Sequence, residues 1–361
     1  MKPFRRSCAV LAAAPAAAAV LALAVALPGQ AATTGWRSVL THHDGVATNY
    51  SGYTAVAVPG PGDAWAFGST NLAGAPAPGV PVAEHWNGAT WSGSPLPSGL
   101  HSEINAADVV SASSVWAVTE TNGDILHWDG RRWSVAEQEP GSSGLLSTGI
   151  TAVSDSDVWA FGCSGLGPGT GTWHFDGKTW TKVTGSAAGL VSASAVSATN
   201  IWAIGATSTG PCGDMLTHYN GTGWQPVTAP ALNGLLFRGI LALSGTDVWA
   251  IAGNASGGQA QLVHFNGSTW TSVKAPYSGI TLWFFAPDGH GGFWLDGSTG
   301  PSQTSVLHYS AGGQWSRTTL TSGSMGPIAL VPGTTSLWGA GSVPTSTPAS
   351  NARIWEYGQA G

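Results

Sequence analysis

Six histidines recur along the chain, and each stands directly before an aromatic residue. They are His85, His127, His174, His218, His264 and His308. Imidazoles act as general acids and bases near neutral pH, and they are frequent metal ligands. Successive members lie 42 to 47 residues apart, so we expect one histidine in each of six repeated units rather than one shared site.

The first five of these histidines are expected to hydrogen-bond the short polar residue that opens the neighbouring strand of their own unit. The expected partners are, in chain order, Asp63, Ser114, Asp157, Asn200 and Asp247. The sixth unit has Gly292 at this position, and the seventh places Ser336 opposite Ile354. We therefore expect no such bond in the last two units. Bonds of this kind would commit the histidines to the fold rather than to catalysis or to a metal.

A second set of chemically capable residues departs from the repeat. Its members are Tyr50, Tyr53, His101, Glu103, Asn105, Arg238 and Trp283. Trp283 or Tyr53 could stack on a sugar ring, and His101 with Glu103 could form an acid–base pair. An ordinary polar rim is the simpler interpretation. The candidate ligand-binding residues are Tyr53, His101, Glu103, Arg238 and Trp283, and no catalytic residue is assigned.

Asp296 is a further departure, because the other units carry apolar residues at its position. Those residues are Phe67, Val118, Phe161, Ile204, Ile251 and Ala340. A buried carboxylate is costly unless it is partnered, so we expect a hydrogen-bonded structural acid or a looser blade rather than an active-site carboxylate. No nucleophile elbow, phosphate-binding loop or zinc-binding helix motif occurs, and neither a cofactor nor a metal is expected.

The elements that carry these residues follow from a sevenfold repeat. A Trp recurs every 43 to 51 residues, at Trp65, Trp116, Trp159, Trp202, Trp249, Trp294 and Trp338. In the third copy, alternating segments at 149–153, 158–162, 172–175 and 179–183 predict four strands, the last two joined by the tight turn Asp176-Gly177. Seven such units predict an all-β, seven-bladed β-propeller with four antiparallel strands per blade. A linear solenoid is the alternative.

The two chain ends favour the closed ring. The seventh copy has a third strand near 352–358 and then stops, whereas residues 34–39 match the fourth strand of other copies. The N-terminal strand, Trp36 to Leu40, should therefore pair with Ala352 to Tyr357 and complete the last blade. Such closure removes two exposed sheet edges, which a linear array would keep.

Residues 1–32 are predicted to be a signal peptide, and residues 33–361 the propeller. Basic residues at Lys2, Arg5 and Arg6 precede an apolar run from Ala9 to Leu27. An uncleaved membrane anchor is the alternative. Cleavage would remove three of 12 basic and none of 18 acidic residues, leaving a net charge of −9. This balance disfavours nucleic acid and anionic membranes as partners.

Two cysteines remain after residue 32, namely Cys163 and Cys212. In an exported chain two cysteines predict one disulfide. Each follows the second strand of its unit, and the two units are neighbours, so both should lie in loops on the same face of the propeller.

The repeat resembles that of secreted bacterial, actinobacterial-type seven-bladed β-propellers. In that family Asp-Val-Trp-Ala-x-Gly is followed by His-Trp-Asn/Asp-Gly-x-x-Trp, and residues 157–162 and 174–180 follow this pattern with Phe175 in place of the first Trp of the second motif. The resemblance covers residues 34–361 and implies the fold and export, but it carries no activity. We expect a secreted, extracellular, monomeric binding or scaffold module whose partner is a glycan or an extracellular protein. The alternative is a glycoside hydrolase or polysaccharide lyase acting at the mouth of the central channel.

Overall fold

The computed structural model describes residues 35–42, 50–71, 79–100, 102–138, 148–164, 167–207, 210–254, 260–300, 303–320, 323–346 and 349–358. All of them belong to one compact unit, residues 33–361. The predicted signal peptide lies outside the described residues. None of the helices within the described ranges is long and apolar enough to cross a membrane.

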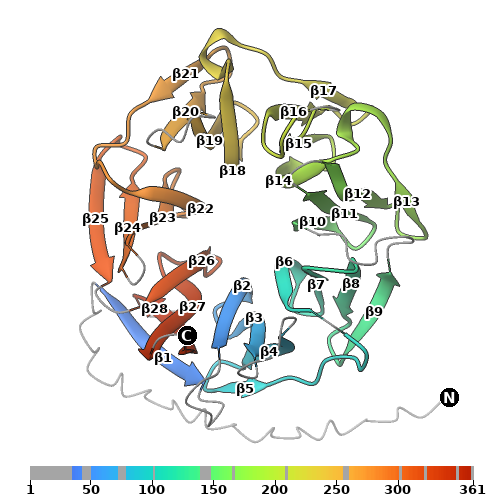
Figure 1. Cartoon of the computed structure of the whole chain (residues 1–361), viewed down its shortest axis with the longest axis vertical. Coiled ribbons are helices and arrows are strands. Elements are labelled where there is room, and N and C mark those ends of the chain that lie inside the picture. Colours follow the sequence, from blue (N-terminus) through green and yellow to red (C-terminus); the bar gives the residue numbers. More distant parts are fainter. Residues whose placement is uncertain are drawn as a thin grey trace, which may run out of the picture. The chain divides into compact units, whose positions relative to one another are not determined.

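Seven four-stranded antiparallel blades surround a central channel (Figure 1). We number the blades one to seven along the chain and name the strands of each blade a to d from the channel outward. Blades one to three comprise β2 (Tyr50–Gly60), β3 (Asp63–Asn71), β4 (Val80–Trp86) and β5 (Trp91–Gly93); β6 (Ile104–Ser111), β7 (Ser114–Thr119), β8 (Asp124–Trp128) and β9 (Trp133–Gln138); and β10 (Gly149–Ser154), β11 (Asp157–Ser164), β12 (Gly167–Phe175) and β13 (Trp180–Lys182).

The second half of the ring repeats this order. Blades four to six comprise β14 (Leu190–Ser197), β15 (Asn200–Gly205), β16 (Met215–Tyr219) and β17 (Trp224–Pro226); β18 (Leu235–Ser244), β19 (Asp247–Asn254), β20 (Gln261–Phe265) and β21 (Trp270–Val273); and β22 (Thr281–Pro287), β23 (Phe293–Gly300), β24 (Gln303–Tyr309) and β25 (Trp315–Leu320). Two short 3₁₀ turns, η1 (Gly185–Ala187) and η2 (Pro230–Leu232), precede β14 and β18. The predicted fold class is confirmed.

Blade seven joins the two ends of the chain, as predicted. It comprises β26 (Ser324–Leu330), β27 (Leu337–Ser346), β28 (Ala349–Tyr357) and, as strand d, β1 (Trp36–His42). The antiparallel register of β1 and β28 runs from Trp36 opposite Tyr357 to His42 opposite Ala352. The ring is therefore closed by a strand from the other end of the sequence.

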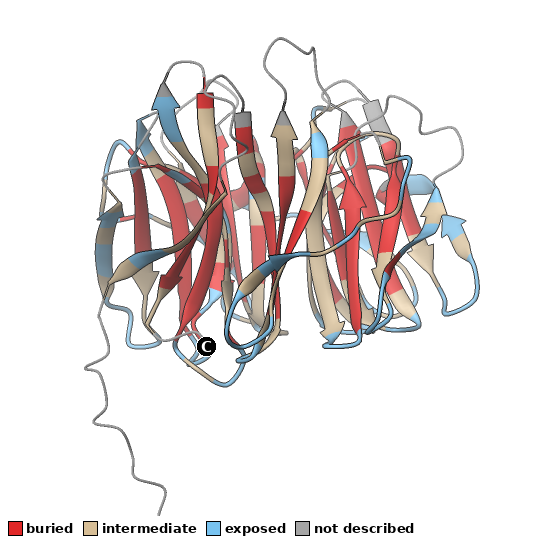
Figure 2. Ribbon diagram, turned by 90° about the horizontal axis from the view of Figure 1, so that it is seen from below, coloured by how far each residue is buried: buried red, intermediate tan, exposed pale blue. Residues whose placement is uncertain are grey.

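The hydrophobic core is divided among the seven junctions between blades. Between blades one and two, Trp65 and Phe67 of β3 pack with Ile104 and Trp133 of the next blade. Each of the other six junctions has its own apolar cluster. Burial is accordingly concentrated along the blades, whereas many turns and outer strands are exposed (Figure 2). The recurrent tryptophans hold neighbouring blades together.

Candidate functional site

Strand a bends near its first residues in six of the seven blades, at the mouth of the channel. A register shift in its pairing with strand b marks a β-bulge there in every blade except blade three. Bulges of this kind redirect side chains away from the regular alternation of a strand. The bulge residues are Thr54, Asn105, Val191, Arg238, Trp283, Phe284, Gly326 and Pro327.

Blades five and six use these bulges to expose one cation and two aromatic rings. Trp283 is 42% exposed and Phe284 is 45% exposed. Arg238 is also exposed, with its guanidinium carbon 5.4 Å from the centroid of the Trp283 ring. No ion pair joins Arg238 to any described residue. We call Arg238, Trp283 and Phe284 the mouth cluster.

Asp296, on the neighbouring strand, holds the backbone of the mouth cluster at Phe284. It lies on β23, is 1% exposed, and accepts a hydrogen bond of 2.8 Å from the backbone N–H of Phe284 through Oδ1. Burial raises the pKa of Asp296 well above its ordinary value, although backbone hydrogen bonds act in the opposite direction. The carboxyl group thus satisfies a backbone donor that the wide bulge removes from the ladder, as expected for a bonded structural acid.

Tyr53 does not share this surface, contrary to the interpretation that its ring could stack on a ligand. Its side chain is 3% exposed and packs between blades seven and one with Val56 and Trp338. Burial, followed by the nearby charge of Glu84, raises the pKa of Tyr53. A bulge follows Tyr53 in β2, but the ring turns into the junction between the blades and has no face at the surface.

Glu103 lies on the opposite side of the mouth, in blade two, and His101 lies outside the described residues. The hydroxyl of Ser69 donates a 2.8 Å hydrogen bond to Glu103 Oε2. The backbone N–H of Glu120, in the loop between β7 and β8, donates a 2.8 Å hydrogen bond to the backbone carbonyl of Glu103. Burial, followed by the charge of Glu103, raises the pKa of Glu120. Glu120 did not stand out from the sequence because nothing there indicates its proximity to Glu103.

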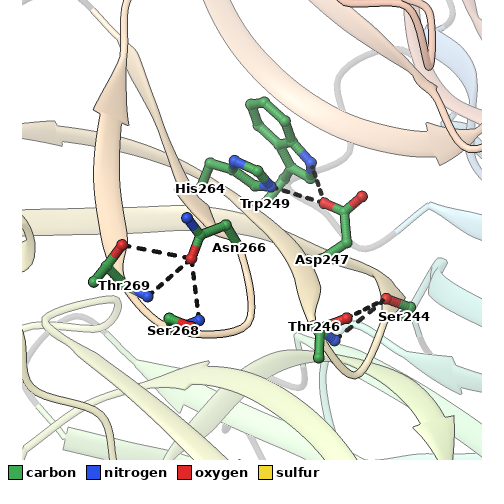
Figure 3. Close-up of polar contacts among 8 residues, drawn as sticks. All are labelled: Ser244, Thr246, Asp247, Trp249, His264, Asn266, Ser268 and Thr269. Carbon is green, nitrogen blue, oxygen red and sulfur yellow. Dashed lines mark hydrogen bonds and ion pairs between the residues drawn. The ribbon is translucent and has the colours of Figure 1, made fainter.

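The five expected histidine bonds are all present. His85 contacts Asp63 at 2.8 Å, His127 contacts Ser114 at 3.0 Å, and His174, His218 and His264 contact Asp157, Asn200 and Asp247 at 2.9 Å. Each imidazole also lies over the Trp of strand b, with ring centroids 4.0 to 4.3 Å apart. Figure 3 shows the arrangement at His264, where Asp247 also accepts a bond from the Trp249 indole. These rings are committed to the fold.

The expectation for blade six was wrong. His308 does form a bond, 2.9 Å from Nε2 to Oδ2 of Asp288. Asp288 lies at the end of β22 rather than at the start of β23, and its Oδ1 accepts the N–H groups of His290 and Gly292. Burial alone would raise the pKa of Asp288, but the hydrogen bond from His308 and those backbone bonds lower it overall. A longer turn thus supplies the missing acid from a different position.

The register in blade seven also differs from the prediction. Glu356, not Ile354, lies opposite Trp338 and so occupies the histidine position. Glu356 is 1% exposed and forms an ion pair with Arg37 of β1. In blade seven, Glu356-Tyr357 is therefore the counterpart of the His-aromatic pair of the other blades.

The predicted disulfide is present and lies close to the mouth cluster. Cys163 and Cys212 are bonded, with Cα atoms 6.0 Å apart. Gly213, the next residue, accepts a 2.7 Å hydrogen bond from the backbone N–H of Phe237. Phe237 directly precedes Arg238, so the disulfide-bonded loop of blade four supports the bulge that presents the guanidinium. Within the described ranges, no group of three or more His, Cys, Asp or Glu side chains is arranged to hold a metal ion.

Comparisons with known proteins define the fold class. No protein-family model matches the chain, and no curated protein matches it. Solved structures do match. YCF48 bound to D1 peptide has a TM-score of 0.60 at 15% identity, covering 91% of this chain and 98% of the other. A catalytically inactive virginiamycin B lyase from Staphylococcus aureus with quinupristin has a TM-score of 0.60 at 11% identity, covering 89% and 99%.

A third similar structure, the WD40 repeats of RRP9, has a TM-score of 0.59 at 9% identity, covering 90% of this chain and 97% of the other. The chain is therefore a seven-bladed β-propeller. The similar structures include binding proteins and a lyase, and identities this low carry the fold alone.

Proposed function

We propose that this protein is an exported bacterial propeller that binds an extracellular ligand at the mouth of its channel without catalysing a reaction. One observation carries the proposal: Trp283 and Phe284 are both exposed at one bulge, and the Arg238 guanidinium lies against the Trp283 ring without an ion pair to any described residue. The ligand is a glycan or an extracellular protein. A sugar ring could stack on the aromatic faces, and Trp and Arg dominate the energetics of many protein interfaces.

The way in which the cluster is built supports a role in binding. Exposing two adjacent aromatic rings is unfavourable in water, and holding them requires a buried carboxyl group at Asp296, where other blades place apolar side chains. Both costs arise at the same bulge. Exposed aromatic side chains and a buried carboxyl group both oppose stability. Two such departures at one place on the surface are expected at a functional site.

The histidines support a non-catalytic role. All six are bonded through Nε2 to a polar side chain and lie against the Trp of strand b. They stand in six different blades, so they do not form one shared site. Export is proposed from the sequence of residues 1–32, and a disulfide accords with an oxidising compartment. We propose that the protein acts as a monomer.

A screen of the purified chain against a glycan array and an extracellular-protein array tests the proposal. Binding should require Trp283 and Phe284, so the double variant Trp283→Ala/Phe284→Ala should lose it. Val135→Ala is the matched control, because Val135 is 44% exposed but lies on β9, an outer strand. Binding that survives the double variant, or no binding on either array, would contradict the proposal.

A second candidate function, a carbohydrate-active enzyme, is favoured by Glu103 and Glu120. Glycoside hydrolysis uses two carboxyl groups of unequal pKa, and the pKa of Glu120 is raised by burial and then by Glu103. A polysaccharide-degradation assay decides between the candidates. Turnover that Glu120→Gln abolishes would establish the enzyme, whereas binding without turnover supports the binding module.

A further inference from the structure

The central channel contains a cavity of about 680 Å³, whose lining does not include the three residues of the mouth cluster. Its walls are strands a of blades two to six, which surround the channel in Figure 1. Most lining residues have apolar side chains, of which Val196 is exposed, but polar atoms make up the larger part of the wall surface. Cavities of 300–1,000 Å³ are the usual setting for small ligands.

Asp108 is the one charged residue on these walls among the residues that the structure describes. Its Oδ2 accepts a 2.9 Å hydrogen bond from the backbone N–H of Ala152 in blade three, and its Oδ1 accepts one of 2.8 Å from the N–H of Val109. Asp108 therefore links β6 to β10 across the junction between two blades.

Blades four and five show that this link does not require a charge. Ser194 occupies the position in β14 that Asp108 occupies in β6, since both lie opposite the recurrent Trp of strand b. The Ser194 hydroxyl accepts a 2.9 Å hydrogen bond from the backbone N–H of Ala242 in the next blade. A neutral oxygen thus makes the same contact at the same distance. The negative charge of Asp108 is not needed for the link.

That charge has no cationic partner in the described structure. No Lys, Arg or His lines the cavity, and no ion pair involves Asp108. The paired strand β7 and the facing strand β10 carry no ionisable side chain, and the ionisable residues of β2, Tyr50 and Tyr53, cannot carry a positive charge. A desolvated carboxylate is unfavourable even with two backbone hydrogen bonds, and a cation would offset its charge.

We propose that the channel cavity binds a small organic amine, with its ammonium group on Asp108 and its apolar body against the exposed side chain of Val196. An ammonium donates hydrogen bonds to the carboxylate and removes the uncompensated charge. A bare metal ion would need several more oxygen or nitrogen ligands, which the cavity walls do not gather.

The protonation of Asp108 gives the proposal an independent readout. Burial raises the pKa of Asp108 to about 6, although the two backbone hydrogen bonds lower it in part. An ammonium ligand requires the ionised form. Its affinity should therefore fall as the pH decreases below about 6, and its binding should in turn lower the pKa of Asp108.

The test uses n-alkylammonium chlorides from propyl to hexyl, with the matching n-alcohols as neutral probes. Affinity is measured by NMR titration of the purified full chain, following the backbone amide of Ala152. At pH 7.5 each ammonium should bind at least about tenfold more tightly than its alcohol, as expected for a hydrogen bond to a charged group. Affinity should rise with chain length as more of the apolar wall is covered.

Asp108→Ser is the decisive variant, because Ser194 already makes the same link in this fold. It should remain folded and lose the preference for ammonium over alcohol. Asp155→Ser is the control, since it removes one negative charge from an exposed turn between β10 and β11, and it should bind like the wild type. The proposal is overturned if no probe binds, if alcohols bind equally well, or if Asp108→Ser keeps the preference. None of these results bears on the mouth cluster.

Discussion

The imidazole of His174 lies nearly flat against the indole of Trp159, with ring centroids 4.0 Å apart and planes inclined by 23°. Its Nε2–H donates to Asp157 Oδ1, which also accepts the indole N–H of Trp159 at 2.8 Å. The histidine thereby joins strand c to strand b within one blade. The indole in turn reaches Trp224 of the next blade, with centroids 5.4 Å apart.

His174→Ala should destabilise the protein by about 1–3 kcal/mol, because Asp157 loses one of its donors and the indole loses its cover. Urea denaturation at pH 7.5 measures the change. Ligand binding at the mouth should be unaffected in the folded variant. A variant with unchanged stability and altered binding would mean that the histidines serve function rather than the fold.

Asn200→Asp should raise the pKa of His218. Burial now lowers the pKa of His218, whose partner is the neutral Asn200. A lowered histidine pKa makes stability fall as the pH decreases through the ordinary histidine range, because the unfolded chain binds the proton more tightly. A carboxylate partner favours the imidazolium and should reduce this loss. NMR titration of the His218 ring measures its pKa in the variant. An unchanged or lower pKa would contradict this prediction.

Asp296→Asn should stabilise the protein increasingly as the pH rises, because the amide keeps an acceptor for Phe284 and cannot ionise in the buried site. The raised pKa of Asp296 means that the native state holds this proton more tightly than the unfolded chain. Stability contributed by that proton is lost as the pH rises from the ordinary aspartate range through the raised pKa. The gain from the substitution should therefore grow with pH between 4 and 8, in urea denaturation. A gain in the free energy of unfolding that is the same at every pH would contradict this explanation.

Arg37 and Glu356 should be energetically coupled, because their ion pair spans the strands that close the ring. Glu356 is 1% exposed, so Arg37→Ala should cost about 1–3 kcal/mol by leaving a buried carboxylate without this partner. In a double-mutant cycle with Glu356→Gln, the double variant should lose less stability than the sum of the single variants. Simple additivity would show that the pair does not contribute to closure.

Removal of the disulfide by Cys163→Ser/Cys212→Ser should lower stability by about 4 kcal/mol, from the entropy of closing a loop across 49 residues. Because Gly213 supports Phe237 beside Arg238, affinity at the mouth should also fall. Thermal denaturation and the array measurement test the two effects separately. Unchanged affinity of the double variant would show that the disulfide-bonded loop does not position Arg238.

The architecture was predictable because the repeat imposes one local pattern seven times. The Trp of strand b, the histidine before an aromatic residue and the Asn/Asp-Gly turn fix the strand order and the register within a blade. The missing strand d of blade seven and the matching N-terminal segment predicted β1 on β28. The partner of His308 was missed because blade six has a longer turn, from which Asp288 reaches the ring.

The candidate site was harder to predict because bulges decide which side chains face the solvent. The alternation of a strand does not reveal where a residue is inserted, so Tyr53 and Trp283 looked equivalent in sequence. The structure buries Tyr53 between two blades and exposes Trp283. Phe284 was missed for the same reason, since an aromatic residue in strand a normally packs inward. Asp296 was recognisable, but its contact with Phe284 was not.

The most direct measurement is the affinity of Trp283→Ala and Val135→Ala for the strongest-binding probe on the arrays, relative to the wild type. Both positions are exposed, and the two substitutions are expected to leave the fold intact. We expect Trp283→Ala to bind about tenfold more weakly or worse, as is typical of an aromatic hot spot, and Val135→Ala to bind like the wild type. Equal affinity of wild type and Trp283→Ala would contradict a binding site at the channel mouth.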